Sequence, residues 1–141
     1  MPALLSHFHS VSLCILATMA LTGCGKTAEP TSYHVSGLVT FGGQPIPYGG
    51  IQFIPDETKG NIGPGGYATI LNGKYSTQIT GKGIIGGPYQ ILITGMKRAP
   101  TEEKDPDLAT ASMILFEEYR TTAELPKAST TWDQDIPRTE R

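Results

Sequence analysis

From residue 33 onward the chain is built of short apolar runs separated by glycine and proline, and this spacing limits its fold more than any other feature. The sequence holds 17 glycines and 11 prolines in 141 residues. These two residue types mark turns, and the β-branched and aromatic runs between them favour strands. The expected strands cover residues 33–41, 51–54, 67–71, 74–79, 89–94 and 131–136. Such spacing predicts an all-β fold, an antiparallel β-sandwich of about seven strands.

The most specific local signal is the dipeptide Asn72-Gly73, which separates the runs 67–71 and 74–79. Asparagine and glycine tolerate positive φ at both central positions of a type I′ turn. We therefore expect these two runs to pair as a tight hairpin.

One segment between the expected strands is open to two interpretations. Asp105 suits a helix N-cap and Pro106 suits the first helical position, so a short helix could run from there toward Tyr119. Alternatively, residues 115–119 could be extended.

The N-terminal segment is apolar and uncharged from Val11 to Leu21. Its length suits the hydrophobic region of a signal peptide and is too short for a transmembrane helix. It ends in Leu21-Thr22-Gly23-Cys24, which resembles the lipobox of bacterial lipoprotein signal peptides. The resemblance implies cleavage after Gly23 and attachment of fatty acids such as palmitate to Cys24. A buried core helix with an incidental cysteine is the competing interpretation, and the lack of an amphipathic stripe disfavours it.

This motif divides the chain into a signal peptide (1–23), a flexible tether (24–32) and one domain (33–141). Removal of the signal leaves 118 of the 141 residues, enough for a single core. The net charge is −2, and the sequence has no basic patch that would suggest binding to nucleic acid. Cys14 leaves with the signal and Cys24 is expected to be acylated. The mature domain then has no thiol for a disulfide or a thiolate metal site.

Residues 33–55 carry a second resemblance. They contain a Val-x-Gly-x-Val strand, a Gly-x-Pro turn and a following strand with a phenylalanine. This order, continued by the Asn-Gly-Lys-Tyr hairpin, resembles carboxypeptidase-regulatory-like, transthyretin-like domains over most of residues 33–137. The resemblance implies a Greek-key sandwich. Such domains behind a lipobox are typical of small envelope lipoproteins of planctomycete-like bacteria, and the family has no agreed activity.

The sequence offers few residues that could catalyse a reaction. His34 is the one histidine left after the signal is removed, and a lone histidine on a strand is usually structural. No nucleophile-elbow sequence is present, and one histidine without a free cysteine cannot supply the usual zinc ligands. The transthyretin-like resemblance raises hydroxyisourate hydrolase activity, but the run 119–122 (Tyr-Arg-Thr-Thr) matches that family's Tyr-Arg-Gly-Ser ending only in part. We therefore expect no enzyme, no cofactor and no catalytic residue.

Acidic residues and aromatic residues leave two binding hypotheses open. Calcium could be held by the acids of residues 102–107 (Glu102, Glu103, Asp105, Asp107) or by Asp133 and Asp135, although solvated positions explain both groups better. Exposed aromatic side chains could stack on sugar rings, although filling the core is their more usual role. The candidates are Tyr33, Tyr48, Tyr67, Tyr75, Tyr89, Tyr119 and Trp132.

Together these patterns predict a non-catalytic, lipid-anchored β-sandwich on the periplasmic or extracellular face of the cell envelope. Its expected contacts are the membrane, through the anchor at Cys24, and an envelope protein or glycan. The first alternative is a carbohydrate-binding module. A hydroxyisourate-hydrolase-like enzyme is a remote one.

Overall fold

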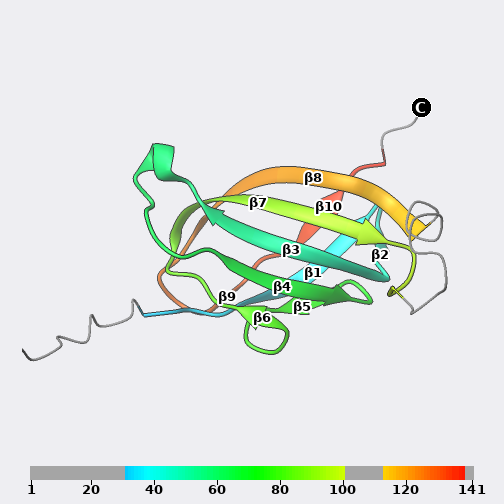
Figure 1. The fold of residues 1–141 in the computed structure, drawn as a ribbon, viewed down its shortest axis with the longest axis horizontal. Coiled ribbons are helices and arrows are strands. Elements are labelled where there is room, and N and C mark those ends of the chain that lie inside the picture. Colours follow the sequence, from blue (N-terminus) through cyan, green and yellow to red (C-terminus); the bar gives the residue numbers. More distant parts are fainter. Residues whose placement is uncertain (1–30, 101–112, 139–141) are drawn as a thin grey trace, which may run out of the picture.

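The structure, a computed structural model, describes residues 31–100 and 113–138 (Figure 1). Within these ranges the chain forms ten strands and one short 3₁₀ helix. The elements are β1 (Val35–Phe41), β2 (Gln44–Pro45), β3 (Tyr48–Pro55), η1 (Glu57–Lys59), β4 (Gly66–Leu71), β5 (Lys74–Ser76), β6 (Gly81–Lys82), β7 (Gly87–Met96), β8 (Ile114–Leu125), β9 (Thr130–Thr131) and β10 (Gln134–Ile136). The predicted all-β class is confirmed.

The strands form one sheet in the order β10-β1-β5-β4-β3-β7-β8, curled into a half-barrel. Figure 1 shows β8, β7, β3, β4 and β5 side by side, with β1 and β10 behind them, so the arrangement is sandwich-like. Neighbouring strands are antiparallel, except that β9 and β10 run parallel to β1. The short strands β2 and β9 also pair with β1, and β6 pairs with β4.

The core lies inside this curl and follows the two-residue period of the strands. Alternate residues of β3 and β7 are fully buried, which is the pattern of a sheet with one wet face. Phe53 is at the centre: its ring centroid lies 6.2 Å from that of Tyr75, 6.3 Å from that of Tyr89 and 6.5 Å from that of Trp132. Aromatic packing therefore joins β3, β5 and β7 to the segment between β9 and β10.

The hairpin at Asn72-Gly73 is confirmed. Asn72 has φ of 49° and Gly73 has φ of 78°, and Leu71 pairs with Lys74 across the turn. The turn is also held from outside, because the Gly73 amide donates to the Ile46 carbonyl and the Gly73 carbonyl accepts from the Val39 amide, both at 2.7 Å. This dipeptide thus joins the hairpin to β1 and to the loop after β2.

Two expected elements differ from the structure, and one open alternative is decided. Residues 115–119 are extended as part of β8, where they lie beside β7, so the extended alternative is confirmed over the helix; the Asp105 and Pro106 cap lies outside the described residues. The expected strand 74–79 ends as β5 at Ser76, where the Ser76 carbonyl accepts from the Ile79 and Thr80 amides in a turn. The regular strand β1 begins at Val35, and Tyr33 forms only an isolated bridge with Ile84.

The expected last strand, 131–136, is divided into β9 and β10. Both pair with β1 in one continuous register, but Trp132 and Asp133 interrupt the ladder. The Asp133 carboxylate, rather than a backbone carbonyl, accepts from the Leu38 amide at 2.7 Å. At Gly37 a Cβ atom would lie 2.0 Å from the Trp132 carbonyl oxygen, so only glycine permits this approach.

Candidate functional site

A polar hollow opens where the start of β1 meets β5 and β9. Its volume is about 490 Å³, and it is lined by His34, Ser36, Ser76, Gln78, Ser129, Thr130 and Thr131. Hydroxyl, amide and imidazole groups make up this lining, which suits a ligand that exchanges hydrogen bonds. The lining includes no carboxylate and no lysine or arginine side chain.

His34 is the histidine that the sequence left as the one candidate acid–base group. Its backbone is fixed, since its amide donates to Ser129 Oγ at 3.3 Å and its carbonyl accepts from the Thr130 amide at 2.9 Å. Its Nδ1 atom is buried and has no hydrogen-bond partner. A general base needs a partner that orients the ring. The lining of the hollow offers hydroxyl groups but no carboxylate that could orient the His34 ring.

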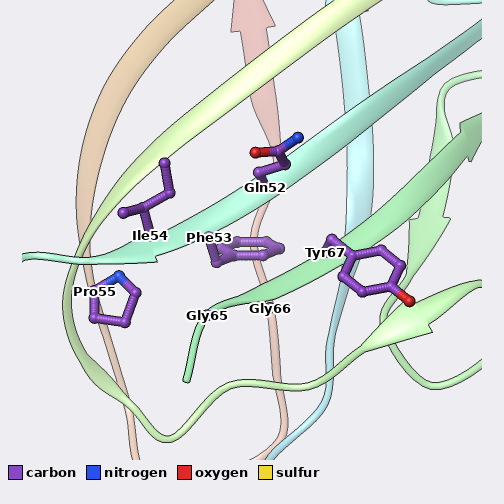
Figure 2. A pocket seen from close by; sticks show the side chains of 7 residues that line it. All are labelled: Gln52, Phe53, Ile54, Pro55, Gly65, Gly66 and Tyr67. Carbon is purple, nitrogen blue, oxygen red and sulfur yellow. The ribbon is translucent and has the colours of Figure 1, made fainter. Parts of the chain in front are cut away.

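A second depression lies on the outer face of β3 and β4 (Figure 2). Its volume is about 310 Å³, and Figure 2 shows Ile54 and Pro55 at one end and Tyr67 at the other. Ile54 is 40% exposed and Tyr67 is 53% exposed, whereas Phe53 between them is fully buried. The depression therefore offers a small apolar surface without a charged group.

The acidic pair considered for calcium binding, Asp133 and Asp135, is exposed. Both carboxylates accept hydrogen bonds from β1 or from the turn after it. Besides the bond from Asp133 to Leu38, Asp135 Oδ1 accepts from the Thr40 hydroxyl and from the Gly43 amide, the latter at 2.9 Å. These hydrogen bonds lower the pKa of the Asp135 carboxyl from its ordinary value. Both carboxylates therefore cap backbone and hydroxyl donors of β1 and of the turn after it.

In the part of the chain that the structure describes, no three His, Cys, Asp or Glu side chains come together as a metal ligand set. The other candidate acids, at residues 102, 103, 105 and 107, lie outside the described residues.

The run that resembled the end of hydroxyisourate hydrolases lies in β8. Tyr119 and Arg120 are consecutive strand residues, so their side chains point to opposite faces of the sheet. Tyr119 is half-buried against the core, while Arg120 is exposed and pairs with Glu118. None of these residues lines the hollow that contains His34. The run 119–122 and His34 therefore lie in separate parts of the fold.

The aromatic residues mostly face inward. Tyr75 and Tyr89 are buried, Tyr33, Tyr48, Tyr119 and Trp132 are half-buried, and Tyr67 is exposed. The Tyr75 hydroxyl donates to the Trp132 carbonyl at 2.7 Å, and burial raises the pKa of this phenol. A platform of several exposed rings, as sugar stacking requires, is not present among the described aromatic residues.

The lipobox residues Leu21, Thr22, Gly23 and Cys24 lie outside the described residues, so their role stays a prediction. No helix in the described ranges has the length and apolar character to span a bilayer. The chain matches no family model, no curated protein and no solved structure. The likeness to carboxypeptidase-regulatory-like lipoproteins therefore remains an interpretation of sequence.

Sequence reasoning missed the polar hollow. Its residues come from three segments, 34–36, 76–78 and 129–131, and each alone reads as an ordinary polar strand end. The pairing of β1 with both β5 and β9 brings them together. A serine or threonine in every segment was the one available signal, and it is too common to single out a site.

Proposed function

We propose that the chain is a lipid-anchored, non-catalytic module of the cell envelope, with a structural or interaction role for its β-sandwich domain. The observation that carries this proposal is the sequence Leu21-Thr22-Gly23-Cys24 behind an uncharged apolar segment. A lipidated cysteine bearing more than one acyl chain anchors a protein stably, at about 0.8 kcal/mol per buried CH₂ group.

The start of the folded domain supports this arrangement. Tyr33 is fixed to Ile84 by two backbone hydrogen bonds of 2.7 and 2.9 Å, and Cys24 lies nine residues before it. An extended tether spans at most about 3.3–3.6 Å per residue, so the domain would stay within roughly 30 Å of the anchor. Such a short tether suits a module that works close to the membrane surface.

The engagement of polar groups supports a non-catalytic role. Among the described carboxylates, Asp133 and Asp135 cap β1, and Asp56 caps η1 through the Thr58 amide. The Thr58 hydroxyl also donates to Asp56 and, as the main cause, lowers the pKa of its carboxyl. These carboxylates hold β1, the turn after it and η1 in place rather than converge on a reacting atom.

Carbohydrate binding is the second candidate function, and the hydroxyl-lined hollow around His34 is the observation that favours it. Sugars exchange several hydrogen bonds with such side chains. The hollow has no tyrosine, tryptophan or phenylalanine ring for stacking, which is why this role comes second.

Metabolic labelling with an alkynyl fatty acid tests the anchor. Wild type should take up label and fractionate with membranes, whereas Cys24→Ala should take up none. Cys14→Ala is the matched control, since Cys14 lies within the apolar segment, and its label should equal that of wild type. Absence of label from wild type, or equal label in Cys24→Ala, would overturn the proposal.

Two binding assays separate the proposed roles. Cross-linking of the anchored wild-type protein in native membranes should recover a specific envelope protein that the Cys24→Ala protein does not recover. A glycan array probed with the purified protein tests the second candidate. Glycan binding that Gln78→Ala abolishes, with no protein partner recovered, would place the carbohydrate role first.

A further inference from the structure

The strand β8 ends the sheet. It pairs with β7 along one side, and no strand in the described ranges pairs with its other side. Figure 1 shows β8 as the long orange strand at the upper border of the sheet, with β7 directly beneath it. An edge of this kind presents unpaired backbone N–H and C=O groups to a further strand.

The structure also determines which backbone groups of β8 face outward. In β7 the Pro88 carbonyl accepts from the Asp56 amide, in line with the ladder between β7 and β3. Antiparallel strands alternate, so the odd-numbered residues of β7 from Gly87 to Ile93 bond to β8 instead. These residues pair with Tyr119, Thr121, Ala123 and Leu125 of β8. Consequently the backbone N–H and C=O groups of the alternate residues of β8 point to the free edge. These residues are Arg120, Thr122 and Glu124.

The usable edge is short and regular. The pairing of β8 with β7 shifts register between Ile93 and Gly95 and again between Gly95 and Met96, which marks bulges before Tyr119. After Leu125 comes Pro126, which has no amide to donate. The stretch from Arg120 to Glu124 is therefore the part that can accept another strand.

We propose that this edge binds the same edge of a second copy of the chain, antiparallel about a twofold axis at Thr122. In this register Arg120 lies opposite Glu124 of the second copy, and Glu124 lies opposite Arg120 of the second copy. Three residue pairs exchange backbone hydrogen bonds, and both charged pairs are of opposite sign. Cross-strand pairs of opposite charge stabilise a sheet, whereas like charges destabilise it.

Moving the twofold axis to a neighbouring residue of β8 places less favourable side chains opposite each other. An axis at Thr121 places Glu118 opposite Glu124, and an axis at Arg120 places two arginines opposite each other. An axis at Ala123 leaves Arg120 opposite Pro126. Between Arg120 and Glu124, clear of the bulges before Tyr119, the edge is thus self-complementary in the Thr122 register, as a twofold interface requires.

The inner face agrees with this register. Tyr119, Thr121 and Ala123 are half-buried at the border of the core. The axis at Thr122 places Thr121 opposite Ala123 and Tyr119 opposite Leu125, so pairing covers apolar surface that β8 leaves partly exposed. This inference goes beyond the proposed function and holds whether or not Cys24 is acylated; an anchor would add to it by confining the copies to one surface.

Cysteine cross-linking of the full chain in producing cells tests the inference, because an interface of a few residues is weak and needs covalent trapping. Directly opposite residues in a hydrogen-bonded pair have Cα atoms about 5.5 Å apart, within the range of a disulfide. Under mild oxidation Thr122→Cys should yield a thiol-reversible dimer, severalfold above Thr94→Cys. Thr94 is an exposed threonine of β7, away from the edge, and wild type reports the background from Cys14 and Cys24.

Charge reversal then tests the register. In the Thr122→Cys protein, Arg120→Glu places glutamates opposite each other and should reduce the dimer severalfold, and adding Glu124→Arg should restore it. Far-ultraviolet circular dichroism checks that each variant keeps its β structure. The proposal is overturned by a Thr122→Cys dimer no stronger than that of Thr94→Cys, by an Arg120→Glu variant that dimerises unchanged, or by a stronger cross-link from Arg120→Cys.

Discussion

Gly73→Ala tests how the hairpin turn docks on the rest of the fold. Gly73 has φ of 78°, and a Cβ atom there would lie 2.8 Å from Pro45 Cβ and 3.1 Å from Leu38 Cδ1. The proline ring is rigid, and the 2.7 Å bonds from Gly73 to Ile46 and Val39 oppose a shift of the turn. The substitution therefore imposes both a backbone cost and an overlap.

The two costs can be separated with Gly43→Ala. Gly43 has φ of 74°, but a Cβ atom there would meet nothing within 4 Å. Alanine in the left-handed region costs about 1–2 kcal/mol, so Gly43→Ala should lose that amount. Gly73→Ala should lose roughly 1–3 kcal/mol more, the usual range for an overpacked site.

Urea unfolding of the chain without residues 1–24 measures the difference. Domains of this kind have about 5–15 kcal/mol of total stability, so the loss in Gly73→Ala is a large fraction of it. We expect its midpoint to fall well below that of Gly43→Ala, with an unchanged slope. Equal losses in the two variants would refute the contact between the turn and Pro45.

Three further outcomes are expected. Tyr75→Phe should lower the free energy of unfolding by about 1 kcal/mol at neutral pH, because the Trp132 carbonyl loses its donor. The pKa of Tyr75 is raised in the folded state, so wild type loses stability as pH rises above about 10, and the variant should lose less. The pKa of Asp135 is lowered on folding, so its contribution is present above about pH 4 and is lost as pH falls; Asp135→Asn should flatten this acid loss in unfolding measured from pH 2 to 7. The purified protein should show no esterase, peptidase, glycosidase or hydroxyisourate hydrolase turnover above buffer, and an activity abolished by His34→Ala in a folded protein would contradict this.

Local rules predicted the parts of the fold that local chemistry controls. The Asn72-Gly73 turn follows from the two residues that tolerate positive φ, and the alternation in β3 and β7 follows from one buried face. The strand end at Pro55 follows from a missing amide donor. Each of these features depends on residues adjacent in the sequence.

The remaining features depend on contacts between distant segments. The helix signal at Asp105-Pro106 did not extend through residues 114–119, because pairing with β7 holds them extended. The division of the last strand depends on Asp133 reaching the Leu38 amide, a contact between residues 95 positions apart. The hollow around His34 likewise requires β5 and β9 on either side of β1.

The intact mass of wild-type protein extracted from native membranes tests the central claim most directly. A lipid-anchored module predicts a chain that begins at Cys24, lacks residues 1–23 and carries the added mass of a diacylglyceryl group, with or without a third acyl chain. Tandem mass spectrometry should place this mass on the N-terminal cysteine. A protein that retains residues 1–23, or that begins elsewhere and carries no lipid, would contradict the account.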